Sequence, residues 1–135
     1  MTQSSTQFAT ESKGMLWTGR VLSGLMALLF ISDGVGHLMK PAPVVEAFAR
    51  LGYPLSASVG IGALALICTA IYLTPGTSVL GAILLTGYLG GAVSTHVRAG
   101  SPLFETVFPV ILGVLVWAGI FVRDAQLRQL IPLRR

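Results

Sequence analysis

The chain has 135 residues, of which 53% are hydrophobic and 10% charged, and its mean hydropathy is +0.79. A water-soluble domain of this size cannot bury so much apolar surface, so the composition excludes one. The formal charge of +4 does not indicate nucleic-acid binding, because the nine lysines and arginines are scattered and stand mostly at the ends of apolar runs. The single cysteine, Cys68, excludes a disulfide framework and a dithiol redox pair.

The N-terminal part of the chain changes from polar to apolar. Residues 1–14 are rich in Ser, Thr and Gln and predict a disordered cytoplasmic tail. Residues 16–39 form an apolar run that is long enough for a first transmembrane span and too long for a signal-peptide core. Residues 41–54 follow, with Val44, Phe48 and Leu51 at helical spacing, and predict a short amphipathic helix at the membrane interface.

Three further apolar runs complete the chain. The second span is predicted at 56–74 and ends at the tight turn Pro75-Gly76, so the third span, 78–97, must be its antiparallel neighbour. Gly87 and Gly91 form a small-residue face on the third span, and we expect another helix of the same chain, rather than a second copy, to pack closely against it. The fourth span is predicted at 102–122, with a kink at Pro109.

These elements predict an all-α integral membrane four-helix bundle, with a short interfacial helix between the first and second spans. It forms one domain, 15–125, between the tail 1–14 and a basic cytoplasmic tail, 126–135. Four spans bring both termini to the same side of the membrane. That side carries Lys13, Arg20, Arg123, Arg128, Arg134 and Arg135, and the other carries Lys40, Arg50 and Arg98. The positive-inside rule therefore places both termini in the cytoplasm of a bacterial inner membrane.

Polar residues gather at one depth, in the extracytoplasmic half of the bundle. Asp33 and His37 are four residues apart on one face of the first span and can touch. A charged side chain at membrane depth costs about 3 kcal/mol and normally has a partner and a function. The third span ends, and the fourth begins, at this same depth. The predicted catalytic acid–base residues are Asp33, His37, His96 and Glu105, and the predicted ligand-binding residues are Arg98, Tyr88, Thr95 and Lys40; no metal site is predicted.

These residues have two alternative interpretations. Asp33–His37 and Arg98–Glu105 are either functional groups or structural pairs that hold helix ends together near the headgroups. In the functional interpretation the carboxylate of Asp33 orients His37, so that Asp33→Ala costs about 1–3 kcal/mol. That interpretation also predicts a small cavity below segment 41–54, with His37 and His96 on its wall and an apolar floor from the second and third spans. Tyr53 is predicted to be an interfacial anchor instead.

Several short motifs resemble the DoxX-like family of small four-helix bacterial membrane proteins. They are Asp33-Gly34-Val35-Gly36-His37-Leu38-Met39-Lys40-Pro41, Glu46-Ala47-Phe48, Leu51-Gly52-Tyr53-Pro54, Gly90-Gly91-Ala92-Val93 with Thr95-His96, and Phe108-Pro109. Their order and spacing together carry the resemblance, which covers residues 16–124. It implies a four-helix membrane fold and, by analogy with relatives associated with quinones or redox stress, a quinone-linked function.

Three functions follow as hypotheses. The first is a quinone-linked oxidoreductase component, in which Asp33, His37 and His96 bind the head group and relay protons, since an imidazole titrates near neutral pH. It needs electrons from a redox partner subunit or a bound cofactor. The second is a cofactor-free isomerase or hydratase for a lipophilic small molecule, with the same residues as general acid and base. The third is a non-enzymatic scaffold or small transporter, as a monomer or homo-oligomer. A haem between His37 and His96 is the weaker cofactor alternative to a quinone.

Overall fold

The computed structural model describes residues 2–130, with side chains from 13 to 129. The elements, in chain order, are α1 (Thr2–Met39), α2 (Ala42–Leu51), α3 (Ala57–Leu73), the short 3-10 helix η1 (Pro75–Thr77), α4 (Ser78–Ala99), α5 (Leu103–Arg123) and α6 (Ala125–Leu130). The described chain is all-α, as predicted. Each predicted span ends within two residues of a helix end, and the first three helices stop at the Pro and Gly residues that follow them.

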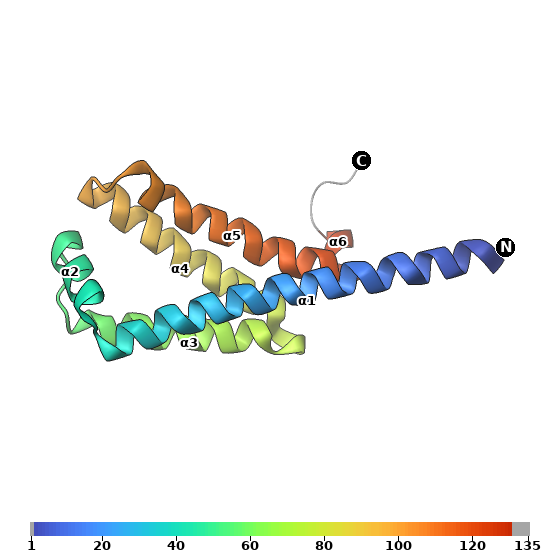
Figure 1. The fold of residues 1–135 in the computed structure, drawn as a ribbon, viewed down its shortest axis with the longest axis horizontal. Helices are drawn as coiled ribbons and strands as arrows, with labels where there is room; N and C mark the ends of the chain where they lie inside the picture. Colours follow the sequence, from blue (N-terminus) through green and yellow to red (C-terminus); the bar gives the residue numbers. More distant parts are fainter. Residues whose placement is uncertain (1, 131–135) are drawn as a thin grey trace.

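Four long helices form the bundle. α1 packs against α3 and α5, and α4 packs against the same two helices, so the order around the bundle is α1, α3, α4, α5. Figure 1 shows that α4 and α5 lie close to α1 and α3 near the turn between α3 and α4, and that the two pairs diverge toward α2. The described part of both termini lies at the closed end.

Three of the four apolar helices have the length that a membrane requires. Lys13–Met39, Pro75–Ala99 and Leu103–Arg123 are each long and apolar enough to cross a bilayer. The fourth apolar helix, Ala57–Leu73, has 17 residues. At 1.5 Å per residue it is about 26 Å long, slightly less than the hydrocarbon core of a typical membrane, which is about 30 Å thick. The predicted all-α membrane bundle is therefore confirmed, with α3 as its shortest member.

The termini differ from the sequence prediction. Helix α1 begins at Thr2, so residues 2–14 continue the first span as helix where a disordered tail was predicted. Adding residues to an existing helix avoids the costly nucleation step, which explains how a polar segment extends an apolar one. At the other end, α6 occupies the first part of the predicted basic tail, and residues 131–135 lie outside the described residues.

The closed end of the bundle is held by small residues and one buried polar network. A methyl group added at Gly119 of α5 would lie 2.6 Å from the Ser23 hydroxyl of α1, which shows how closely these helices approach. The Ser23 hydroxyl lies 3.0 Å from the Tyr72 hydroxyl, which in turn donates to the carbonyl oxygen of Val116 at 2.9 Å. This network joins α1, α3 and α5, with all its hydroxyl groups paired.

The predicted close packing at Gly87 and Gly91 is wrong. A Cβ atom added at either position would meet no heavy atom within 4 Å outside the local chain. The close helix approaches use other glycines, among them Gly34 and Gly62 between α1 and α3, and Gly81 between α4 and α3. Spacing alone marks a small-residue face but does not say whether a helix or a space lies next to it.

Helix α2 lies across the divergent end of the bundle (Figure 1). It follows the corner at Lys40, whose φ of 53° is in the left-handed region, and ends at Gly52, with a φ of 77°. Glycine adopts this conformation at no steric cost, whereas lysine does not. Phe48 is the buried residue of α2, and it anchors the helix to the bundle. The predicted short helix between the first and second spans is confirmed.

Candidate functional site

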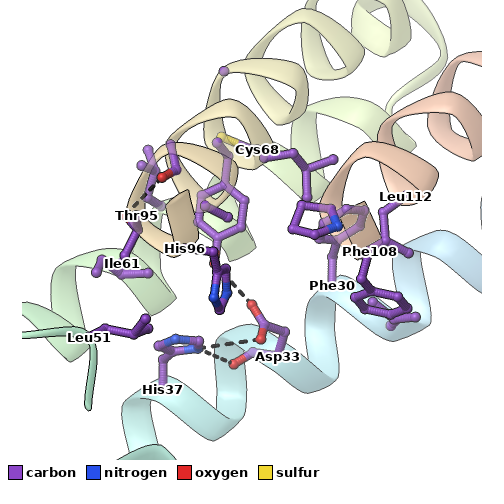
Figure 2. A pocket seen from close by; sticks show the side chains of 18 of the residues that line it. Phe30, Asp33, His37, Leu51, Ile61, Cys68, Thr95, His96, Phe108 and Leu112 are labelled. Carbon is purple, nitrogen blue, oxygen red and sulfur yellow. Dashed lines mark hydrogen bonds and ion pairs between the residues drawn. The ribbon is translucent and has the colours of Figure 1, made fainter. Parts of the chain in front are cut away.

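A cavity of about 640 Å³ lies between the two diverging helix pairs, below α2. All four long helices contribute to its wall, and Phe48 and Leu51 of α2 cover it. Most of the wall is apolar; its larger apolar side chains are Leu29, Phe30, Ile61, Leu64, Leu84, Leu89, Phe108 and Leu112. Six polar side chains also face the cavity: Asp33, His37, Tyr53, Tyr88, Thr95 and His96. A predominantly apolar cavity with a few convergent polar groups is the usual form of a small-molecule site (Figure 2).

Asp33, His37 and Tyr88 form the central polar cluster. The Tyr88 hydroxyl of α4 donates a hydrogen bond of 3.0 Å to the Asp33 carboxylate of α1. The Nδ1 atom of His37 lies 2.8 Å from the backbone carbonyl oxygen of Asp33 and 3.7 Å from its carboxylate (Figure 2). Because a carbonyl oxygen only accepts, Nδ1 carries the hydrogen, and Nε2 of the neutral ring is an acceptor. The predicted contact between Asp33 and His37 is present, but it is mainly to the backbone of Asp33.

His37 has two further contacts, one to its ring and one to its backbone. Phe48 of α2 meets it edge to face, with 5.6 Å between ring centroids. The buried Ser58 hydroxyl of α3 donates to the His37 carbonyl oxygen at 2.6 Å and so holds α1 and α3 together at this level. Neither contact is predictable from the sequence, because Phe48 and Ser58 stand in other elements and no local pattern links them to His37.

His96 and Glu105 lie close together near α2. His96 lines the cavity, and its Nδ1 atom is 3.0 Å from the Ser101 hydroxyl. Glu105 is outside the cavity wall, and its Oε2 atom lies 3.7 Å from His96 Nδ1 and 3.4 Å from an Arg50 nitrogen of α2. The predicted pair Arg98–Glu105 is therefore wrong: Glu105 lies between His96 and Arg50. The folding of α2 over the bundle brings Arg50 to this position.

Arg98 and Tyr53 attach α2 to α4. The Arg98 guanidinium donates to the Leu51 carbonyl oxygen at 3.0 Å and lies 5.4 Å from the centre of the Tyr53 ring. The Tyr53 hydroxyl is 3.1 Å from the Thr95 hydroxyl, which itself donates to the Gly91 carbonyl. Tyr53 thus faces the cavity, where the sequence suggested an interfacial anchor.

Two of the proposed ligand-binding residues, Arg98 and Lys40, are not part of the cavity wall, whereas Tyr88 and Thr95 are. Lys40 stands at the corner between α1 and α2. In the part of the chain with described side chains, no group of three or more His, Cys, Asp or Glu residues is arranged to hold a metal ion. The polar groups of the cavity can donate and accept hydrogen bonds.

Comparison with protein families gives a match. The model of the DoxX-like family matches residues 21–119. The chain belongs to the DoxX-like family. No curated protein and no solved structure matches it.

The family match includes the whole cavity of this DoxX-like protein. The lining residues extend from Leu29 to Leu112, inside the matched range. The helix before residue 21 and the helix α6 lie outside this range. The cavity is consequently a feature of the family domain and not of the terminal extensions.

Proposed function

We propose that this DoxX-like protein binds a lipophilic quinone or quinol in the cavity between its helix pairs. The observation that supports the proposal is the hydrogen-bonded cluster of Asp33, Tyr88 and His37 on the wall of an otherwise apolar cavity. A quinone has the matching form: a flat apolar ring with polar oxygen atoms at its edge. The chain's apolar helices indicate that the cavity lies in the bilayer, where such a molecule dissolves.

The geometry of His37 suits it to exchange a proton with a ring hydroxyl. With Nδ1–H bonded to the Asp33 carbonyl, the Nε2 atom is the acceptor of the neutral ring. It accepts a hydrogen bond from a hydroxyl group and, once protonated, donates one to a carbonyl oxygen. The Asp33 carboxylate lies 3.7 Å from Nδ1, on the same face of α1. His96, which lines the cavity from α4, provides a second imidazole.

The electrons must come from a redox partner or a bound cofactor. The chain has one cysteine and so contains no dithiol that could accept two electrons. In this proposal the chain binds the ring and exchanges its protons, and a redox partner protein supplies or removes the electrons. The protein is thus a component of a membrane oxidoreductase.

Extraction of bound quinone from the purified protein tests the proposal. The protein is purified in nanodiscs made with host lipids, and the quinone is measured per mole of protein by its absorbance. We expect bound quinone in the unmodified protein and at least a tenfold loss of affinity in His37→Ala and Tyr88→Phe, since each variant leaves a polar group of the site or the ligand unpaired. Ser32→Ala is the control, because Ser32 of α1 is exposed and bonds only its own helix, at Leu28. Equal quinone in His37→Ala and Ser32→Ala would contradict the proposal.

A cofactor-free isomerase is the second candidate. The carboxylate of Asp33 is directly bonded to a phenol inside an apolar cavity, and such a pair supplies both a base and an acid. Turnover of an unsaturated lipophilic substrate by the isolated chain, without quinone and without a redox partner, would favour this function over the first.

A further inference from the structure

Gly87 and Gly91 occupy a part of the cavity wall that no side chain fills. They are four residues apart on α4, one before and one after Tyr88 in the sequence, and both line the cavity. A Cβ atom at either position would meet nothing within 4 Å. At five other positions in this bundle, a glycine allows another helix to come close: Gly19, Gly34, Gly62, Gly81 and Gly119. Gly87 and Gly91 have no such packing role, although glycine costs a helix about 1 kcal/mol relative to alanine.

The space beside these glycines is bounded on its other side by polar groups. Asp33 and His37 stand on α1, and the Tyr88–Asp33 hydrogen bond joins α1 to α4 at this level. A ring held by Asp33 and His37 at its edge therefore has the bare backbone of α4 along its side. Glycine is the residue that lets a ligand approach a helix backbone most closely.

We infer that Gly87 and Gly91 form the surface on which the ligand's ring lies, and that they set the largest ring that the cavity accepts. The inference rests on the proposed function and specifies its substrate class: a planar bicyclic ring system fits, and side chains at these positions would restrict the cavity to a single ring. One methylene group more or less in an apolar pocket changes affinity by about 10–200-fold, so a valine at either position is a large change.

Gly90 provides a matched control on the same helix. It lies next to Gly91, and a Cβ atom there also meets nothing within 4 Å. It borders a different, shallower groove on the outer side of α4 and α5, with Gly113 and Trp117. Gly90→Val therefore changes the helix in the same way as Gly91→Val but leaves the cavity unchanged.

The experiment compares two ligands that differ in the ring alone. A methylnaphthoquinone and a trimethylbenzoquinone, each with one decyl chain, are fully substituted on the quinone ring, so that Cys68 cannot add to them. Their dissociation constants are measured in nanodiscs for the unmodified protein and for Gly87→Val, Gly91→Val and Gly90→Val. We expect the two cavity variants to weaken naphthoquinone binding at least tenfold and benzoquinone binding less than threefold, with no change for Gly90→Val. Gly87→Ala and Gly91→Ala serve where a valine variant does not fold.

The outcomes separate the inference from the proposed function. If the unmodified protein binds both quinones but the cavity variants resemble Gly90→Val, the glycine surface does not contact the ring and the inference is overturned. If the unmodified protein binds neither quinone, the proposed function itself fails. A parallel loss of both ligands in the cavity variants would also overturn the inference, because the glycines would then control access and not ring size.

Discussion

The Tyr88 hydroxyl and the Asp33 carboxylate share a hydrogen bond of 3.0 Å that crosses from α4 to α1. It lies where the two helix pairs have already diverged, so it connects helices that are separated at this level by the cavity. The bond therefore belongs to the cavity and not to the packed core of the bundle. Its removal should affect ligand binding far more than folding.

Tyr88→Phe tests this distinction. Hydrogen bonds between membrane helices contribute on average about 0.6 kcal/mol, so we expect a small decrease in stability, measured by thermal unfolding in detergent. Quinone affinity should fall at least tenfold, because the Asp33 carboxylate loses its fixed donor. A decrease in stability above about 2 kcal/mol with unchanged quinone affinity would show that the bond is structural.

Asp33→Ala tests whether the carboxylate of Asp33 or its backbone carbonyl orients the His37 ring. His37 Nδ1 bonds the Asp33 carbonyl oxygen at 2.8 Å, and that carbonyl remains in the variant. We expect His37 to keep its hydrogen on Nδ1, as measured by the ¹⁵N shifts of the ring in solid-state NMR. Asp33→Asn, which keeps an acceptor for Tyr88, is the matched control. A tautomer change in Asp33→Ala would show that the carboxylate, although 3.7 Å away, orients the ring.

The sequence predicts the bundle well, because each span is a long apolar run and Pro or Gly residues separate it from the next span. It also predicts that Asp33 and His37 touch, since residues four apart share a helix face. The partner of Glu105 is not predictable in this way. Arg50 reaches Glu105 only because α2 folds back over the bundle, and that direction is set by the corner at Lys40 and by the burial of Phe48.

The glycines of α4 show the same limit. Gly87 and Gly91 are four residues apart, which is the spacing of a helix-packing face. Gly90 directly precedes Gly91 but lies on a different face of the helix. Whether a helix or a cavity lies beside them depends on how far α4 diverges from α1, which is a property of the whole bundle. Local sequence therefore identifies the polar residues of the cavity, except Tyr53, but not its wall.

The orientation in the membrane is a prediction from charge. Six basic residues on the side of the termini and three on the side of α2 place both termini in the cytoplasm. A fluorescent protein fused to the C-terminus should be bright, and alkaline phosphatase fused there should be inactive. Phosphatase inserted after Gly52, beyond α2, should be active. The reverse pattern would place the cavity in the cytoplasmic leaflet.

A methyl group should have opposite effects on stability at Gly81 and at Gly90 of α4. A Cβ atom at Gly81 would overlap the backbone of Tyr72, which cannot move aside without separating α3 from α4. We expect Gly81→Ala to cost about 3 kcal/mol or more, and Gly90→Ala to be neutral or to stabilise by up to about 1 kcal/mol. Thermal unfolding of both variants in the same detergent measures the difference. Equal midpoints would mean that α3 and α4 do not pack as closely as described.

Loss of a polar contact between α2 and the bundle should loosen α2 without lowering the stability of the whole protein. Arg50 and Glu105 pair at 3.4 Å with side-chain exposures of 58% and 30%, and such pairs contribute at most about 1 kcal/mol to stability. Arg50→Ala should therefore leave the thermal midpoint nearly unchanged. It removes one of the few polar contacts between α2 and the bundle, so the amides of Ala42–Leu51 should exchange with deuterium several-fold faster. Glu46→Ala, an exposed site on the same helix, is the control and should not change the exchange. If Arg50→Ala exchanges no faster than Glu46→Ala, Phe48 and the Arg98–Leu51 hydrogen bond suffice to hold α2 over the cavity.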